Sequence, residues 1–221
     1  MKKAVIVGIN YKISNQLYGC VEDAKDMDFF LKSLGYETYI LIDDDATREA
    51  IIKSFSWLLI DTKEAYFHFS GHGKNSFDGP CLLTSDKKYI THQEINEKLF
   101  SKLGMKTLRM SLDCCIQFTL PWCLIKTKNE KHPVTVTELP CDFQINKNII
   151  IISGVGKTYD KIIDGKRNGI LTYNFLKLLK ENGNMKCSKL LRIMSIKMEG
   201  TGSSVSIYFG QKMGVDTRFL S

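Results

Sequence analysis

Two short motifs in the sequence contain residue types that can carry out nucleophilic chemistry. The first is SGHG (residues 70–73), in which glycines flank His72, and the second is DCC (residues 113–115), which ends on Cys115. A thiol becomes a strong nucleophile when an imidazole takes its proton or holds the thiolate as an ion pair. His72 and Cys115 are therefore candidates for a catalytic pair, if the fold brings them together across the 43 positions between them.

Both motifs end apolar runs that are typical of buried β-strands. Runs rich in β-branched and aromatic residues alternate along the chain with segments of helical periodicity. Such alternation predicts an α/β fold with a mostly parallel six-stranded central sheet and helices on both of its faces. The six expected strands are 4–10, 36–43, 65–70, 108–115, 149–155 and 204–210, and the last of them is a candidate for a sheet edge.

Five segments between these strands have the spacing of helices. Apolar residues recur at intervals of three and four in 21–34, before the candidate C-cap Gly35, and again after the candidate N-cap Thr47. Weaker patterns predict helices at 92–103, 169–181 and 187–198.

Parallel strands place their carboxyl ends at one edge of a sheet, where the following loops meet. If the third and fourth strands are neighbours, His72 and Cys115 lie together above this edge. The flanking glycines permit a close backbone approach, so the amides of Gly73 and Cys115 are candidates for an oxyanion hole. Alternatively, His72 is an ordinary turn histidine and the cysteines are ordinary core residues. The joint placement at two strand ends favours the catalytic pair.

The composition argues against several other classes of protein. The 221 residues suffice for a single domain spanning 1–221, and the apolar runs are too short for a membrane span. The net charge of +7 is spread over separated lysines, which argues against a nucleic-acid surface. Seven cysteines without a CxxC spacing predict a reducing, cytoplasmic setting and no zinc site.

The order of several segments resembles the metacaspases, a family of caspase-like cysteine peptidases. This resemblance implies a caspase-like sandwich, a minimal catalytic domain without a prodomain, and an endopeptidase that uses the dyad of His72 and Cys115. The segments are LYGCVEDAKDMDFFLKSLGY, YFHFSGHG, LDCC, SGVGKTYD and GILTYNFLKLL.

The resemblance also assigns a substrate pocket. It implies that Asp113 forms an acidic floor for an Arg or Lys side chain, together with Cys20, Asp23 and Ser70. Strand geometry agrees in part, because Asp113 and Cys115 share one face while Cys114 points to the other. Without the resemblance, Asp23 would be taken for a solvent-facing acid near a helix N-terminus, and we expect its removal to leave the fold intact.

The chain departs from the family pattern directly after the nucleophile. The usual H-S-G is replaced by Ile116, Gln117 and Phe118, so a catalytically weak caspase-like protein that binds peptides or regulates a partner remains the alternative function. A phosphate-binding loop in SGVGKT is a weaker hypothesis, because that pattern requires a glycine where Ile151 stands, and no clear helix follows.

The segment after SGHG offers few acids for calcium. Asp78 and Asp86 are present, but Thr91 and His92 stand where the family commonly has paired acids, and calcium prefers six to eight oxygen ligands. We therefore expect no metal, no cofactor and activity without calcium.

A flexible connection is expected at about 116–147, with self-cleavage after Lys126, Lys128 or Lys131. The expected partners are polypeptide substrates with Arg or Lys before the scissile bond, and we expect neither a nucleic-acid nor a membrane partner. The family tendency predicts a monomer.

Overall fold

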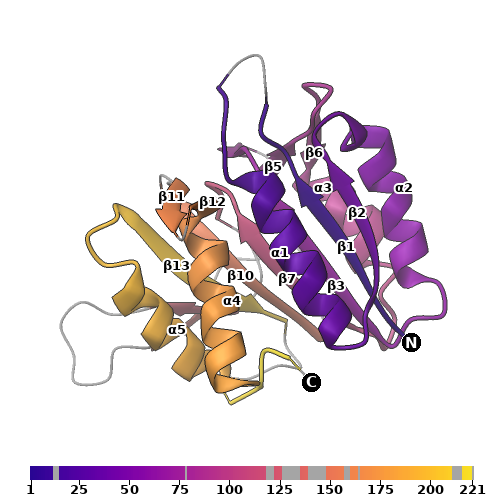
Figure 1. The fold of residues 1–221 in the computed structure, drawn as a ribbon. Helices are drawn as coiled ribbons and strands as arrows, with labels where there is room; N and C mark the ends of the chain where they lie inside the picture. The colour runs from indigo at the N-terminus through magenta and orange to yellow at the C-terminus, as the bar shows by residue number, and fades with distance from the viewer. Residues whose placement is uncertain are drawn as a thin grey trace.

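A mixed β-sheet runs through the centre of the protein, with helices on both faces (Figure 1). The computed structural model describes residues 1–11, 15–77, 79–117, 122–125, 135–138, 148–156, 160–163, 165–210 and 216–220. Within this part of the chain the sheet has eight strands in the order β2-β1-β3-β7-β10-β13-β8-β9. The strands are β1 (Lys2–Gly8), β2 (Glu37–Ile42), β3 (Glu64–Ser70), β7 (Thr107–Asp113), β8 (Trp122–Ile125), β9 (Thr135–Glu138), β10 (Asn148–Gly156) and β13 (Ser203–Phe209).

The six predicted strands are confirmed as β1, β2, β3, β7, β10 and β13. The first five run parallel, and β13 runs antiparallel to β10. Strand β13 was a candidate for a sheet edge, where it would be covered or would pair; within the described residues β8 pairs with its other side, and β9 pairs with β8. These two strands lie inside the segment 116–147 that was expected to be a connection. The expected cleavage positions Lys126, Lys128 and Lys131 lie outside the described residues.

The helices follow the predicted segments closely. Thr47 caps α2 as expected, since its side chain accepts a hydrogen bond from the Ala50 amide at 3.3 Å. Thr91 and Glu94 form a capping box at the start of α3, and one π-helical turn, Asn96–Phe100, extends that helix. The helices are α1 (Cys20–Ser33), α2 (Arg48–Leu59), α3 (His92–Ile95), α4 (Ile170–Asn182) and α5 (Cys187–Lys197).

Each face of the sheet has its own hydrophobic core. Alternate residues of β3 point to opposite sides, so Phe67 packs with Phe55 of α2 on one face. Tyr66 joins the other core, which contains Met27 of α1 and Phe175 of α4. Figure 1 shows α1, α4 and α5 together on this second face. The burial of both faces explains why the central strands are almost continuously apolar.

Two small β-elements complete the fold around the ends of the central strands. After β3, the chain forms β4 (Gly73–Ser76), β5 (Gly79–Leu83) and β6 (Tyr89–Thr91), which pair antiparallel. The hairpin of β11 (Asp160–Ile163) and β12 (Lys166–Gly169) leads directly into α4. Strand β10 continues in the sheet through Gly156, and α4 is the next described helix, so the hypothesis of a phosphate-binding loop has no support here.

Helix α1 lies unusually close to strand β1 at Gly8. A Cβ atom added at Gly8 would overlap with the carbonyl oxygen of Cys20 and would lie 2.7 Å from the Cβ of Ala24. This close approach fixes the start of α1, and therefore Cys20 and Asp23, against the sheet.

We predict that Gly8→Ala lowers the free energy of unfolding by about 1–3 kcal/mol, because the helix must shift away from β1. Urea denaturation monitored by circular dichroism measures this change. Ser56→Ala, on the exposed face of α2, is the control and should change stability by less than about 0.5 kcal/mol. An unchanged midpoint for Gly8→Ala would contradict the proposed contact.

Candidate active site

The register between β3 and β7 brings the two sequence motifs to one edge of the sheet. Ser70 pairs with Asp113, and the Gly71 amide donates a hydrogen bond to the Asp113 carbonyl at 3.2 Å. His72 and Cys115 therefore each lie two residues beyond a paired position on neighbouring parallel strands. The prediction that SGHG and DCC occupy neighbouring strand ends is confirmed.

Gly73 packs directly against the turn that carries Cys115. A Cβ atom on Gly73 would lie 2.6 Å from Cγ2 of Ile116 and 3.4 Å from Cβ of Cys114. These are the two residues that flank Cys115 in the chain. Only glycine allows this approach, so the second glycine of SGHG is required by packing against the nucleophile turn, which is the turn that carries the candidate nucleophile Cys115.

Several hydrogen bonds hold the turn after Asp113 in place. The Ile116 amide donates to the Cys114 carbonyl at 2.9 Å, and the Ser153 hydroxyl of β10 donates to the Ile116 carbonyl at 3.2 Å. The Gln117 amide donates to Oδ1 of Asn75 in β4 at 2.9 Å. Ile116 is fully buried, and Cys115 is half-buried. Ile116 and Gln117 thus hold the turn in place through their backbone groups.

Cys114 and Cys115 differ in environment, as the strand geometry predicted. Cys114 is fully buried and belongs to the core on the α2 and α3 face. Burial, and secondarily the charges of Asp113 and Cys115, raises the pKa of the Cys114 thiol well above its usual range. Cys114 is therefore an inert core thiol, and Cys115 is the nucleophile candidate.

The imidazole of His72 is held by the backbone of Asn15. Its Nε2 atom lies 2.5 Å from the Asn15 carbonyl oxygen. Because a carbonyl oxygen can only accept a hydrogen bond, Nε2 carries the proton. In the neutral ring, Nδ1 then has the lone pair that a general base needs.

The predicted pocket acids lie together, but they are covered. Asp23 is fully buried in α1, and its carboxylate accepts hydrogen bonds from the Ser70 hydroxyl (2.8 Å), the Asn168 amide side chain (3.1 Å) and the Gly169 amide (3.0 Å). Oδ2 of Asp113 accepts from the Thr172 amide at 2.9 Å and its hydroxyl at 2.8 Å. The expectation that Asp23 is exposed to solvent is therefore wrong.

The start of α4 explains why two acids can be buried side by side. Gly169 is the N-cap of α4, and a Cβ there would overlap with Oδ2 of Asp113 and lie 2.6 Å from Oδ2 of Asp23. Unpaired amides at a helix N-terminus favour negative charge. Burial, and then repulsion from Asp113, nevertheless raises the pKa of Asp23 well above its usual range.

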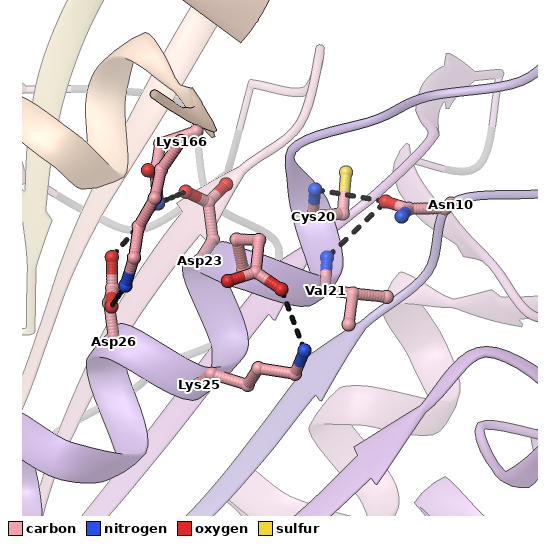
Figure 2. A network of polar contacts seen from close by, with 9 residues as sticks. Asn10, Cys20, Val21, Asp23, Lys25, Asp26 and Lys166 are labelled. Carbon is pink, nitrogen blue, oxygen red and sulfur yellow. Dashed lines mark hydrogen bonds and ion pairs between the residues drawn. The ribbon is translucent and has the colours of Figure 1, made fainter. Parts of the chain in front are cut away.

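Cys20, the remaining predicted pocket residue, is the first residue of α1 and is also buried. Figure 2 shows Asn10 meeting the first amides of this helix: its Oδ1 accepts from Cys20 N at 3.0 Å and from Val21 N at 3.3 Å. Asp23 and Asp26 point from the same helix toward the strand that carries Lys166. Asn10 thus acts as a nonlocal cap for α1, which the local sequence does not reveal.

Strand β12 supplies cationic and polar partners to this end of α1. The Lys166 ammonium lies 3.5 Å from Oδ1 of Asp26, and the Asn168 side chain bridges Asp26 and Asp23 at 3.1 Å each. The guanidinium of Arg167 lies 4.7 Å from the ring centroid of Tyr18. Sequence analysis identified none of these partners, because they depend on where the β11–β12 hairpin folds back.

A second histidine lies below the acids on the same face of β3. His68 is fully buried, and its Nδ1 lies 2.8 Å from the Ser111 hydroxyl, which also accepts from Tyr66 at 3.0 Å. Burial lowers the pKa of His68 to about 3, so the ring is neutral at physiological pH. Its place within the sheet makes it a core residue.

Asp86, one of the acids that follow SGHG in the sequence, is hydrogen-bonded by neighbouring protein groups. Within those ranges, no three His, Cys, Asp or Glu side chains gather as metal ligands would. Although burial opposes it, hydrogen bonds from Thr84 and the Arg48 amide, together with Lys88, lower the pKa of Asp86 to about 2. Thr91 and His92 belong to the start of α3, and Asp78 lies outside the described residues. The Asp86 carboxylate thus accepts hydrogen bonds from the Thr84 hydroxyl and the Arg48 amide.

None of the helices in the described ranges has the length and apolar character needed to cross a bilayer.

Comparison with known proteins agrees with this geometry. A family model described as "Caspase domain" matches residues 1–213. The Drosophila initiator caspase Dronc superposes with a TM-score of 0.65 at 11% identity, covering 98% of this chain and 81% of Dronc. A crystal structure of a Geobacter sulfurreducens protein gives a TM-score of 0.67 at 16% identity, covering 99% and 98% of the two chains. The chain therefore belongs to the caspase-domain family, and its fold is caspase-like.

Curated relatives of the chain are metacaspases. Metacaspase-3 of Arabidopsis thaliana is 26% identical over 88% of this chain and 66% of the relative. Metacaspase-2 of Trypanosoma brucei brucei is 34% identical over 51% of this chain and 40% of the relative. Metacaspase-1 of Debaryomyces hansenii is 41% identical over 33% and 20%, respectively. The chain thus spans only part of the length of these relatives.

The buried acids generate a prediction about pH. A raised native pKa means that the stabilising contribution of Asp23 is complete below the unfolded-state pKa of about 4 and is lost as pH rises through the native value. Asp23→Asn cannot ionise, so the stability of this variant relative to wild type should improve steadily from pH 4.5 to pH 8. Urea midpoints across this range measure the trend.

Glu22→Gln is the matched control, because Glu22 lies on the same helix in an ion pair with Lys25 that is open to solvent. Its stability difference from wild type should vary little with pH. A constant offset for Asp23→Asn across the range would show that Asp23 does not titrate as its environment implies.

Proposed function

We propose that the protein is a cysteine endopeptidase that cleaves polypeptides after Arg or Lys through His72 and Cys115. The observation that carries this proposal is the packing of Gly73 against Cys114 and Ile116, which sets the histidine turn against the cysteine turn. The different environments of the two cysteines support Cys115 as the nucleophile.

The proposed chemistry assigns one role to each of the two side chains. Nδ1 of His72 takes the proton of the Cys115 thiol, and the thiolate sulfur attacks the scissile carbonyl carbon. The imidazolium then gives its proton to the leaving amine as the peptide C–N bond breaks. Water, deprotonated by the same imidazole, hydrolyses the thioester and releases the acid product. The Asn15 carbonyl keeps the other ring nitrogen protonated throughout.

The Gly73 amide is a suitable oxyanion donor because of the β4–β5 ladder. The Leu83 amide donates to the His72 carbonyl at 3.0 Å, so these residues form a hydrogen-bonded pair. Hydrogen-bonded and non-hydrogen-bonded pairs alternate in antiparallel strands, so the Gly73 amide points away from β5. Gly73 faces the turn of Cys115, and its amide can complete an oxyanion hole with the Cys115 amide.

Charge near the start of α1 supports a preference for basic side chains. The carboxyl groups of Asp26 and Asp113 lie there beside the buried Asp23, and the chain's own Lys166 already lies beside Asp26. The net charge of +7 acts at longer range and is screened beyond about 8 Å at physiological salt. An Asp side chain at this position would add another negative charge, whereas Arg or Lys would complement those present.

A second candidate function is peptide binding or regulation with little or no catalysis. Ile116 favours this alternative, because a rigid buried residue follows Cys115 where the family has a histidine. Reactivity of Cys115 decides between the two functions.

We predict that a peptidyl-arginine chloromethyl ketone labels the wild-type protein on Cys115. Cys115→Ala should abolish labelling, and Cys114→Ala should retain it, since Cys114 is a core thiol. Intact-mass spectrometry measures the adduct. Equal labelling of the Cys115→Ala protein, or no labelling of any variant, would reject the endopeptidase in favour of the binding function.

A matched set of peptides tests specificity. Peptides with Arg or Lys before the cleaved bond should be turned over at least about 100-fold faster than those with citrulline or Asp, because the loss of charge complementarity costs several kcal/mol. Initial rates with fluorogenic substrates give the comparison. Equal turnover of Arg and Asp peptides would refute the acidic-pocket assignment without affecting the dyad.

Activity should persist in excess chelator, because Asp86 is committed to Thr84 and the Arg48 amide rather than to a cation site. Rates with an Arg peptide in calcium and in EDTA should agree within about twofold, given the poor oxygen donor set. A strict calcium requirement would contradict this proposal.

Self-cleavage after Lys126, Lys128 or Lys131 remains a prediction, with Cys115→Ala expected to stay intact.

A further inference from the structure

The loop after β1 reaches the histidine turn through Tyr11. The Tyr11 hydroxyl accepts a hydrogen bond from the His72 amide at 3.1 Å and donates one to the Leu83 carbonyl at 2.5 Å. Its ring centroid lies 4.7 Å from that of the His72 imidazole, with a tilt of 43°. Tyr11 therefore contacts both the backbone and the side chain of His72.

The hydroxyl occupies a specific place in the β4–β5 ladder. Leu83 N donates to the His72 carbonyl at 3.0 Å, which is one half of a reciprocal antiparallel pair. In a regular ladder the His72 amide would donate directly to the Leu83 carbonyl. Here the Tyr11 hydroxyl stands between these two groups and satisfies both of them. It acts as a spacer between the His72 amide and the Leu83 carbonyl, while the other half of the pair stays directly hydrogen-bonded.

Two further features show that the chain is built around this contact. A Cβ atom at Gly71 would lie 3.0 Å from the Tyr11 hydroxyl oxygen, so the first glycine of SGHG leaves room for the tyrosine. Tyr11 itself has a φ of +53°, a left-handed conformation that non-glycine residues rarely adopt. Neighbouring Asn10 is fixed by the first amides of α1 and by Asp43. The backbone of β1 thus leaves the sheet in the geometry that directs Tyr11 to His72.

We propose that Tyr11 is a positioning residue for His72, which sets the imidazole so that Nε2 meets the Asn15 carbonyl and Nδ1 faces the nucleophile turn. Its catalytic consequence rests on the proposed function, whereas its effect on the histidine does not. Tyr11→Phe removes the spacer hydroxyl, so the His72 amide either moves toward the Leu83 carbonyl or loses its partner. Tyr11→Leu also removes the ring that packs on the imidazole.

The first experiment reads His72 directly and needs no activity. Long-range ¹H–¹⁵N NMR spectra of the Cys115→Ala protein report which ring nitrogen of each histidine carries a proton. The His72 signals are assigned by their loss in His72→Gln. We expect one tautomer, protonated at Nε2, with wild-type Tyr11, a mixture in Tyr11→Phe, and a more evenly mixed state in Tyr11→Leu. Tyr39→Phe, at a ring that packs on Trp57, is the control and should retain the single tautomer.

The second experiment separates positioning from general stability. With an Arg peptide, Tyr11→Phe should lower kcat by about 10-fold or more while KM stays within about twofold, because misalignment affects the reacting groups more than substrate binding. Thermal melts confirm that each variant is folded. Unchanged His72 tautomers in both Tyr11 variants would overturn the proposal. If wild type cleaves no peptide, the proposed function fails, and the NMR result alone decides the role of Tyr11.

Discussion

The parallel register between β3 and β7 is the constraint on which the candidate site depends. Because Ser70 pairs with Asp113, the two strands end at the same level of the sheet. The residues that follow each strand therefore lie close together. A shift of one residue would turn Asp113 toward the opposite core and separate the histidine turn from the cysteine turn. The two hydrophobic cores enforce this register, since Phe67, Met110 and their neighbours must all face one side.

The buried acids Asp23 and Asp113 have a structural function. Asp23 and Asp113 bind the first amides of α4, and Gly169 leaves space for both carboxylates. Helix α4, strand β7 and helix α1 are therefore joined through hydrogen bonds to buried carboxyl groups as well as through apolar contacts. Because these carboxyl groups also bind the start of α4, their geometry cannot change without affecting the fold.

Much of the architecture could be predicted from the sequence because its signals are local. The six principal strands, the Thr47 cap and the opposite orientations of Cys114 and Cys115 follow from periodicity and strand geometry. The strands β8 and β9 were missed because they lie in a segment without a periodic pattern. The burial of Asp23 was missed for a different reason: its partners Asn168 and Gly169 are more than 140 positions away, in a hairpin whose docking no local pattern encodes. The role of Tyr11 was missed for a similar reason, because its contact with His72 depends on the direction in which the chain leaves β1.

Reactivity of Cys115 with and without His72 is the most direct test of this account. Alkylation by iodoacetamide at neutral pH, followed by peptide mass spectrometry, measures the rate at each cysteine, and the buried Cys114 is an internal reference. If His72 activates the thiol, Cys115 reacts fastest in wild type, and His72→Ala slows it by about 10-fold or more. Equal rates for Cys115 in the two proteins would contradict a dyad of His72 and Cys115.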